Sequence, residues 1–168
     1  MSSLPPVSAT MESTVATDLD PALLDAFLAA EYQVVDGEAR LSLTIGRRHP
    51  KLDQRLRRHP WAILTAFNPG ANQLPDDANQ QRHNQLQAAS ALAGLESLPT
   101  INRAPGHNWP DEHGLLLLAP DRRWLILQAR RFGQLAVVCG EPGGQALLGL
   151  LDPCPVNPLP AAVFELHG

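Results

Sequence analysis

The chain has 168 residues, of which 44% are hydrophobic and 18% charged, and its formal net charge at pH 7 is −4. This composition supplies enough apolar side chains for the core of one domain and excludes a chain that is disordered throughout. The acidic balance argues against nucleic-acid binding, and no apolar run approaches the roughly 20 residues that cross a membrane.

The start of the chain has neither the basic residues nor the continuous apolar stretch of a secretory signal. Its two cysteines, Cys139 and Cys154, are too few for a disulfide framework. We therefore expect a cytoplasmic protein in which both thiols are reduced.

Residues 1–17 are rich in Ser, Thr, Pro and Ala, and we expect a disordered tail there, because they can bury too little surface to offset the entropy lost on ordering. A single domain is predicted to follow over residues 18–151. Its first helix is expected to follow Asp20, which can act as its N-cap, with Pro21 at the first helical position. This helix should end near Glu31.

Two strand-like runs come next and flank Asp36-Gly37, a pair that is typical of a type I′ hairpin turn. The segment 47–59 carries six Arg or Lys residues against one Asp, and it predicts a short basic helix after Pro50. The continuous apolar run 61–67 predicts a buried strand.

The longest helix is predicted over residues 76–93, with a buried stripe that includes Leu86, Ala89, Leu92 and Ala93. The core strands expected after it should bury Leu116 and Val137. Those strands are predicted at residues 98–102, 114–119 and 134–139. A helix capped by Asp121 is predicted over residues 121–132, and the final hairpin arm over residues 145–151.

Taken together, the elements between residues 61 and 139 predict an α+β fold with a ferredoxin-like split β-α-β core. An N-terminal helix and hairpin and an extra C-terminal strand would be added to it. The proline-rich residues 152–168 should form an extended tail. A doubly wound parallel sheet is the alternative, but the loop between residues 102 and 114 is too short for a crossover helix.

In the ferredoxin-like arrangement four polar segments meet at one end of the sheet. They are the Asn-Pro-Gly loop after the first buried strand, the start of the long helix, the loop 107–113 and the junction 131–134. A helix N-terminus and arginine side chains suit an anion, and Trp109 could provide a stacking wall. The candidate ligand-binding residues are Asn68, Gly70, Asn79, Arg82, Glu112, Arg131 and Gln134.

Two interpretations of these residues stay open. They could bind a small anionic or nucleotide-like ligand, or Asn68 and Asn79 could satisfy loop backbone while Arg82 pairs with Asp111 or Glu112. A different hypothesis for the whole protein is a non-catalytic interaction or regulatory module that uses the basic segment 47–59 or a sheet edge as its contact surface.

The sequence contains no phosphate-binding G-x-x-x-x-G-K motif and no G-x-S-x-G nucleophile motif. His107, Asp111 and His113 share one short loop, but their spacing fits no closed zinc pattern. We therefore expect no metal and no cofactor, and the sequence assigns neither a reaction nor an oligomeric state.

Several motifs together resemble a bacterial family catalogued as a domain of unknown function, number 3293. They are WAILTAFNPG, the N-x-x-R of Asn79 and Arg82, the W-P-x-E that ends at Glu112, RRFGQ at 130–134, and the Gly-Glu pair at 140–141. The resemblance spans about residues 20–150 and implies one globular domain without an assigned activity. Members usually have Ser or Thr before the long helix, where this chain has Leu74-Pro75.

Overall fold

The structure is a computed structural model that describes residues 19–168. The tail predicted for residues 1–17 lies outside these described residues. The helices are α1 (Pro21–Ala29), α2 (Pro50–Arg55), α3 (Asp76–Leu92) and α4 (Arg122–Arg131), and short 3-10 turns lie at Pro69–Ala71 and Pro105–His107. The strands are β1 (Glu31–Asp36), β2 (Ala39–Leu43), β3 (Trp61–Thr65), β4 (Ser97–Arg103), β5 (Glu112–Leu118), β6 (Ala136–Gly140), β7 (Leu147–Leu150) and β8 (Val163–Glu165).

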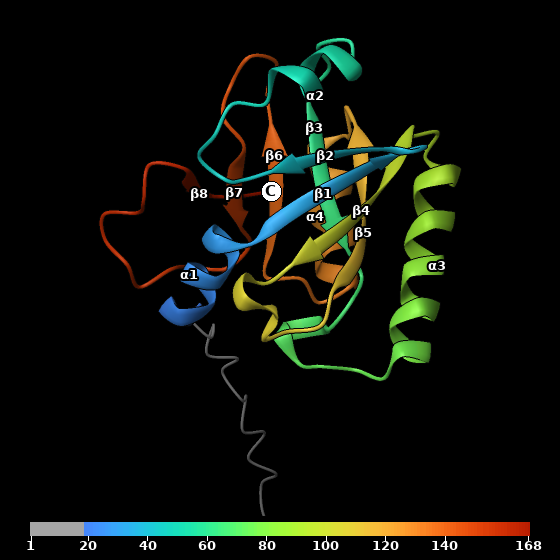
Figure 1. Ribbon diagram of the computed structural model, residues 1–168. Coiled ribbons are helices and arrows are strands. Elements are labelled where there is room, and N and C mark those ends of the chain that lie inside the picture. Colours follow the sequence, from blue (N-terminus) through green and yellow to red (C-terminus); the bar gives the residue numbers. More distant parts are fainter. Residues whose placement is uncertain (1–18) are drawn as a thin grey trace, which may run out of the picture.

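All of these strands belong to one sheet with the order β2-β1-β4-β5-β3-β6-β7-β8. Every neighbouring pair is antiparallel except β7 and β8. The predicted α+β class is confirmed, and the antiparallel central strands exclude a doubly wound parallel sheet. Figure 1 shows that the sheet is strongly curled, with β1 and β2 crossing over the central strands.

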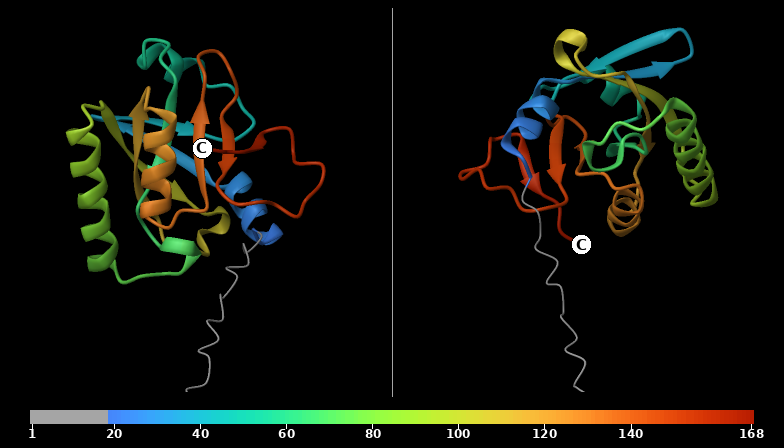
Figure 2. Two further views of the ribbon diagram at one scale, coloured as in Figure 1. Left: turned by 180° about the vertical axis from the view of Figure 1, so that it is seen from behind. Right: turned by 90° about the horizontal axis from the view of Figure 1, so that it is seen from below.

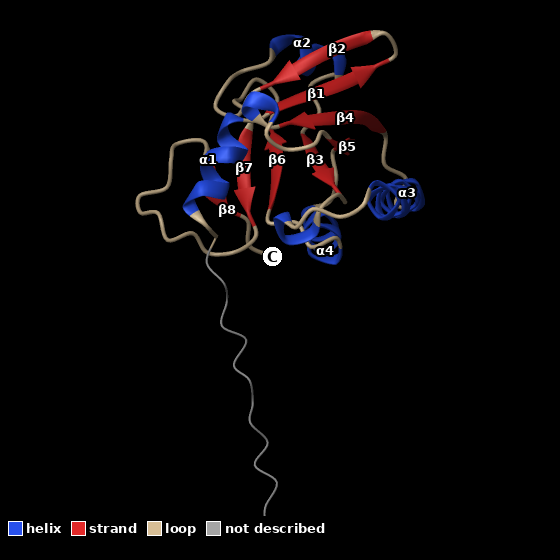
Figure 3. Cartoon of the chain, turned by 60° about the horizontal axis from the view of Figure 1, so that its bottom comes forward, coloured by secondary structure: helices blue, strands red, loops and turns tan. Residues whose placement is uncertain are grey.

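The two faces of the sheet hold two hydrophobic clusters because the side chains of each strand alternate between them. On β3, Trp61 and Ile63 join the cluster inside the curl, whereas Ala62 and Leu64 join the cluster outside it. Helices α1 and α2 contribute to the inner cluster, and α3 and α4 cover the outer face (Figure 2). In Figure 3, α1 occupies the space between the arm formed by β1 and β2 and the strand β7.

The predicted helix caps are confirmed. The Asp20 carboxylate accepts a hydrogen bond of 2.9 Å from the backbone N–H of Ala22, and the Asp121 carboxylate accepts one of 3.0 Å from that of Trp124. Each cap satisfies an N–H that has no partner within its helix. No helix within residues 19–168 is long and apolar enough to span a membrane.

The hairpin of β1 and β2 forms where it was predicted, but its turn is not type I′. Its central residues are Gly37 and Glu38, since Asp36 already pairs with Ala39 in the ladder. Of the two central residues, Gly37 alone has a positive φ, 60°, whereas a type I′ turn needs positive φ at both.

Leu116 and Val137 lie in the core as predicted, with exposed fractions of 0% and 2%. The stripe predicted on α3 is wrong at its C-terminal end, because Leu92 is 92% exposed and Ala93 is also exposed. The buried residues of α3 are Asn79, His83, Leu86 and Ser90. At about 100° per residue, Leu92 lies roughly 200° around the helix from Ser90 and therefore faces away from the sheet.

The C-terminal residues are part of the sheet. β7 forms the predicted antiparallel hairpin with β6, and β8 then adds in parallel to β7. Val163 and Leu166 are buried, and the backbone N–H of Leu19 donates to the carbonyl of Pro153 at 3.1 Å. The boundary predicted at residue 151 therefore has a strand of the same sheet beyond it.

Candidate ligand-binding pocket

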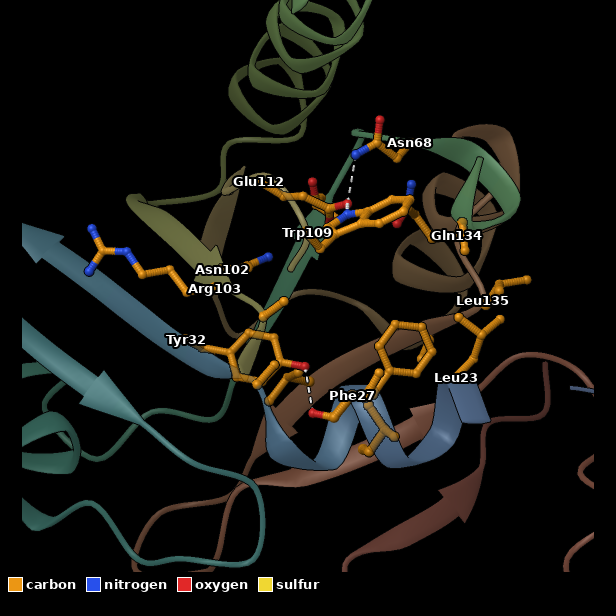
Figure 4. A pocket seen from close by; sticks show the side chains of 18 of the residues that line it. Leu23, Phe27, Tyr32, Asn68, Asn102, Arg103, Trp109, Glu112, Gln134 and Leu135 are labelled. Atoms are coloured by element: carbon orange, nitrogen blue, oxygen red, sulfur yellow. Dashed lines mark hydrogen bonds between the residues drawn. The ribbon is translucent and has the colours of Figure 1, made fainter. Parts of the chain in front are cut away.

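A cavity of about 290 Å³ opens where β3 ends and β5 begins. Its walls come from α1, from β1, from the Asn-Pro-Gly loop, from residues 104–109 and from the start of β6. Figure 4 shows Trp109 on one side of the cavity, Phe27 and Tyr32 opposite it, and Leu23 and Leu135 at one end. The walls are therefore mainly apolar and aromatic.

The Glu112 carboxylate lines this cavity and is held in place by hydrogen bonds. As the first residue of β5, Glu112 faces the inner side of the curl, and its Oε1 accepts hydrogen bonds from Asn68 Nδ2 at 2.8 Å and from Trp109 Nε1 at 2.9 Å. Within residues 19–168, Oε2 accepts no hydrogen bond. Two donors thus orient the carboxylate and leave one oxygen available.

The Asn68 and Asn79 side chains form a reciprocal pair that shapes the loop beside the cavity. The backbone N–H of Asn68 donates to Asn79 Oδ1 at 2.9 Å, and Asn79 Nδ2 donates to Asn68 Oδ1 at 2.8 Å. Asn68 has a left-handed backbone, with φ 47° and ψ 64°, which asparagine tolerates better than most residues. The pair fixes the turn that brings Asn68 to Glu112.

Arg82 and Gln134 join the same cluster through backbone carbonyls. Arg82 donates from Nε to the carbonyl of Ala66 at 2.8 Å and from Nη2 to that of Phe132 at 2.6 Å. Gln134 Nε2 donates to the carbonyls of Phe67 and Phe132 at 2.9 and 3.1 Å. The guanidinium of Arg82 therefore joins the end of β3 to the end of α4, and it contacts neither of its predicted carboxylate partners.

The remaining candidates lie around this cluster. The backbone N–H of Gly70 donates to the carbonyl of Gly133 at 2.7 Å. Arg131 lies over the Phe132 ring, 5.0 Å from its centroid, and donates to Gln128 Oε1. Of the predicted ligand residues, the cavity is lined by Asn68, Glu112 and Gln134, whereas Gly70, Asn79, Arg82 and Arg131 do not line it.

Sequence reasoning missed the wall formed by α1 and β1 and the contribution of β4. Tyr32 pairs in register with Asn102, and Asn102 pairs with Glu112, so the three side chains form one row across three strands. Tyr32 Oη donates to the carbonyl of Phe27 at 3.0 Å. Burial, and in addition the nearby Glu112 carboxylate, raise the pKa of Tyr32 far above its usual range. Strand alternation would have predicted this row only if the register had been known.

Two buried polar atoms lie on β4, in Asn102 of this row and in Thr100 two residues before it. Asn102 Oδ1 and Thr100 Oγ1 are both buried, and neither makes a hydrogen bond with any residue between 19 and 168. Gly114 lies opposite Thr100, and a Cβ atom there would come within 2.8 Å of Thr100 Oγ1. Gly114 therefore lets Thr100 Oγ1 pack closely against β5, where a larger residue would not fit.

His83 on α3 and His113 on β5 lie on the outer side of the sheet. The rings of His83 and His113 are 6.3 Å apart, and each also contacts Phe67. Burial, with a further contribution from His113, lowers the pKa of His83. Over residues 19–168, no three His, Cys, Asp or Glu residues gather in a way that could hold a metal ion.

The basic segment 47–59 lies at the opposite end of the sheet from the cavity (Figure 1). Arg55 forms an ion pair with Asp36, and Arg57 lies 3.2 Å from Glu96. Asp53 accepts a hydrogen bond from the backbone N–H of Gly143. Part of the positive charge of this segment is thus compensated within the protein.

Residues 64–137 match the model of a family described as a protein of unknown function, DUF3293. The chain carries a DUF3293 segment. The resemblance read from the sequence motifs is thereby confirmed over these residues. The DUF3293 segment contains Asn68, Asn102, Trp109, Glu112 and Gln134, whereas the wall formed by α1 and β1 lies outside it. No curated protein and no solved structure matches the chain.

Proposed function

We propose that the DUF3293 segment and α1 together form a binding pocket for a small organic molecule. The observation that carries this proposal is a mainly apolar cavity that holds one oriented carboxylate with a free oxygen. Its volume, about 290 Å³, is close to the lower end of the roughly 300–1,000 Å³ of known ligand pockets. The site therefore suits a molecule of one or two rings.

The position of Glu112 supports a binding role. A carboxylate beside apolar walls loses hydration, and this cost must be offset by partners. Asn68 and Trp109 offset part of it at Oε1. A ligand that donates a hydrogen bond to Oε2 would provide the remaining partner of the carboxylate.

The cavity does not favour the anionic ligand that was expected from the arginine residues. Arg82 donates to backbone carbonyls and Arg131 lies outside the cavity lining, so neither guanidinium supports an anionic ligand there. A nucleobase-like ring stays compatible with the aromatic walls.

A screen of aromatic and heteroaromatic fragments by ligand-observed NMR tests the pocket. The variant Ala136→Phe should fill the cavity from β6, and the matched variant Ala88→Phe adds the same ring on α3, away from it. We expect fragments that bind the wild type and Ala88→Phe but not Ala136→Phe, with folding checked by circular dichroism. Equal binding by all three proteins, or by none, would contradict the proposal.

We infer that β3, β4, β5 and β6 with α3 and α4 form a ferredoxin-like unit, since their sheet order is β4-β5-β3-β6 and both helices contribute to the same outer cluster. A cytoplasmic location also stays a proposal. An interaction module built on the segment 47–59 or on a sheet edge has no specific observation in its favour.

A further inference from the structure

The hydrogen-bond donors that line the cavity are already engaged within the protein. Asn68 Nδ2 and Trp109 Nε1 both donate to Glu112, and Tyr32 Oη donates to the carbonyl of Phe27. Thr65 Oγ1 donates to the carbonyl of His113 at 2.7 Å. These side chains have no further hydrogen atom to offer a ligand, apart from the second amide hydrogen of Asn68.

Gln134 is similarly engaged, because its Nε2 donates to two carbonyls. The Arg103 guanidinium donates to Asp111 at 3.1 Å and points away from the rings that surround the cavity (Figure 4). Asn108 belongs to the lining at its exposed rim. The interior of the cavity is therefore poor in available donors.

The acceptors of the same cavity are free. Across residues 19–168, Glu112 Oε2 and Gln134 Oε1 receive no hydrogen bond. Asn102 Oδ1 receives none either, but it is buried and a ligand in the cavity cannot reach it. The Asn102 amide nitrogen is the one interior donor that makes no hydrogen bond within these residues.

Glu112 Oε2 is the acceptor that a ligand in this cavity can meet. Asn102 is the register partner of Glu112 on the adjacent antiparallel strand and faces the same side of the sheet. Because the Asn102 oxygen is buried, the carboxylate of Glu112 presents the charged acceptor between the apolar walls.

From the free carboxylate oxygen between apolar walls we infer that the ligand is a flat, mainly apolar molecule with an edge of N–H donors, of the amidine or amino-heterocycle class, which donates to Glu112 Oε2. The inference rests on the proposed function, because it names the ligand of the same pocket. A positively charged edge would also neutralise Glu112, whose carboxylate already acts on the buried Tyr32. Charge-assisted hydrogen bonds of this kind are stronger where apolar walls exclude water.

Three probes of equal ring size test the inference: benzamidine, benzamide and benzoate. Titration calorimetry with the wild-type protein should give the tightest binding for benzamidine and none for benzoate. In Glu112→Gln, the new side chain keeps an oxygen for Asn68 and Trp109 but presents an NH₂ group to the ligand. Benzamidine should then bind about tenfold or more weakly.

Glu112→Leu removes the carboxylate and keeps an apolar side chain among the apolar walls, so it should also weaken benzamidine binding, which keeps the test valid if Glu112→Gln fails to fold. Glu141→Gln, at the opposite end of β6, is the matched control and should bind benzamidine as the wild type does. The inference is overturned if benzoate binds as well as benzamidine, or if both pocket variants leave benzamidine binding unchanged. The proposed pocket would still be supported if other fragments bound to the wild type but not to Ala136→Phe. If no fragment behaved in this way, the pocket itself would be overturned.

Discussion

Arg82 shows how a single side chain can join two elements that are distant in the sequence. Its Nε and Nη2 donate to the carbonyls of Ala66 and Phe132, and its guanidinium lies 5.6 Å from the centre of the Phe132 ring. The planar guanidinium makes both bonds at once, which an ammonium group would not reproduce. We therefore interpret Arg82 as a residue that holds the end of β3 against the end of α4.

Arg82→Ala should lower the free energy of unfolding by about 2–4 kcal/mol, because two carbonyls lose charged donors. Urea unfolding at neutral pH measures this loss. Arg131→Ala is the control, since Arg131 lies over the same ring but donates to no backbone carbonyl of residues 19–168, and it should cost less than about 1 kcal/mol. Equal losses in the two variants would show that ring stacking, and not the carbonyl contacts, is what Arg82 contributes.

His83 should make stability depend on pH. It is 7% exposed, and burial, together with His113, lowers its pKa below the usual value of 6.5. The unfolded chain therefore binds a proton at a higher pH than the folded protein does. The contribution of neutral His83 is complete above pH 6.5 and is lost as the pH falls toward the lowered pKa.

We expect the difference in unfolding free energy between the wild type and His83→Gln to decrease as the pH falls from about 8 to about 5. Urea unfolding across this range measures it. The exposed Gln85 on the same helix, which has no titratable group, provides the comparison when it is changed to Ala, and its difference from the wild type should stay constant. A His83→Gln difference that does not vary with pH would contradict the assignment.

At the scale of elements, the junction between α4 and β6 needs a glycine at position 133. Gly133 has a φ of 65°, and a Cβ atom there would lie 2.7 Å from Pro69 Cβ. The close approach lets the carbonyl of Gly133 accept the N–H of Gly70. The Asn-Pro-Gly loop and the junction are thus packed against each other without room for a methyl group.

Gly133→Ala should cost about 2–4 kcal/mol, the sum of left-handed backbone strain and overpacking. Gly37→Ala separates the two effects, because Gly37 has a similar φ of 60° and a Cβ atom added there would have nothing within 4 Å. It should cost about 1 kcal/mol. Thermal unfolding of both variants measures the costs, and equal values would refute the close packing at Pro69.

At the scale of the whole molecule, the first described residue and the final strand both pack onto the sheet. Leu19 is 5% exposed and its N–H donates to Pro153, while Val163 and Leu166 are buried beside β7. These residues complete the inner and outer clusters of the curled sheet. The fold therefore depends on its final strand, although the sequence before that strand is rich in proline.

Deletion of residues 1–17 should change the melting temperature by no more than about 1–2 °C, since their composition predicts little buried surface. Deletion of residues 163–168 should lower it by roughly 5 °C or more, because two buried side chains and a strand are lost. Calorimetry of both truncated proteins tests this contrast. A large loss on deleting residues 1–17 would mean that the tail packs on the domain.

The sequence by itself determined the features that depend on neighbouring residues. The caps at Asp20 and Asp121, the hairpin position and the buried strands containing Leu116 and Val137 follow from local chemistry and from alternation along one strand. The polar cluster at one end of the sheet was also predicted, because the order of elements constrains which strand ends meet.

Only the tertiary structure decided which face of the sheet or helix each side chain occupies and which residues it contacts. The pattern alone could not show that Leu92 faces away from the sheet, that β8 returns to its edge, or that Arg82 donates to carbonyls. Nor could it place α1 against the row of Tyr32 and Glu112. These outcomes depend on strand register and on helix rotation, which are set by packing between segments far apart in the sequence.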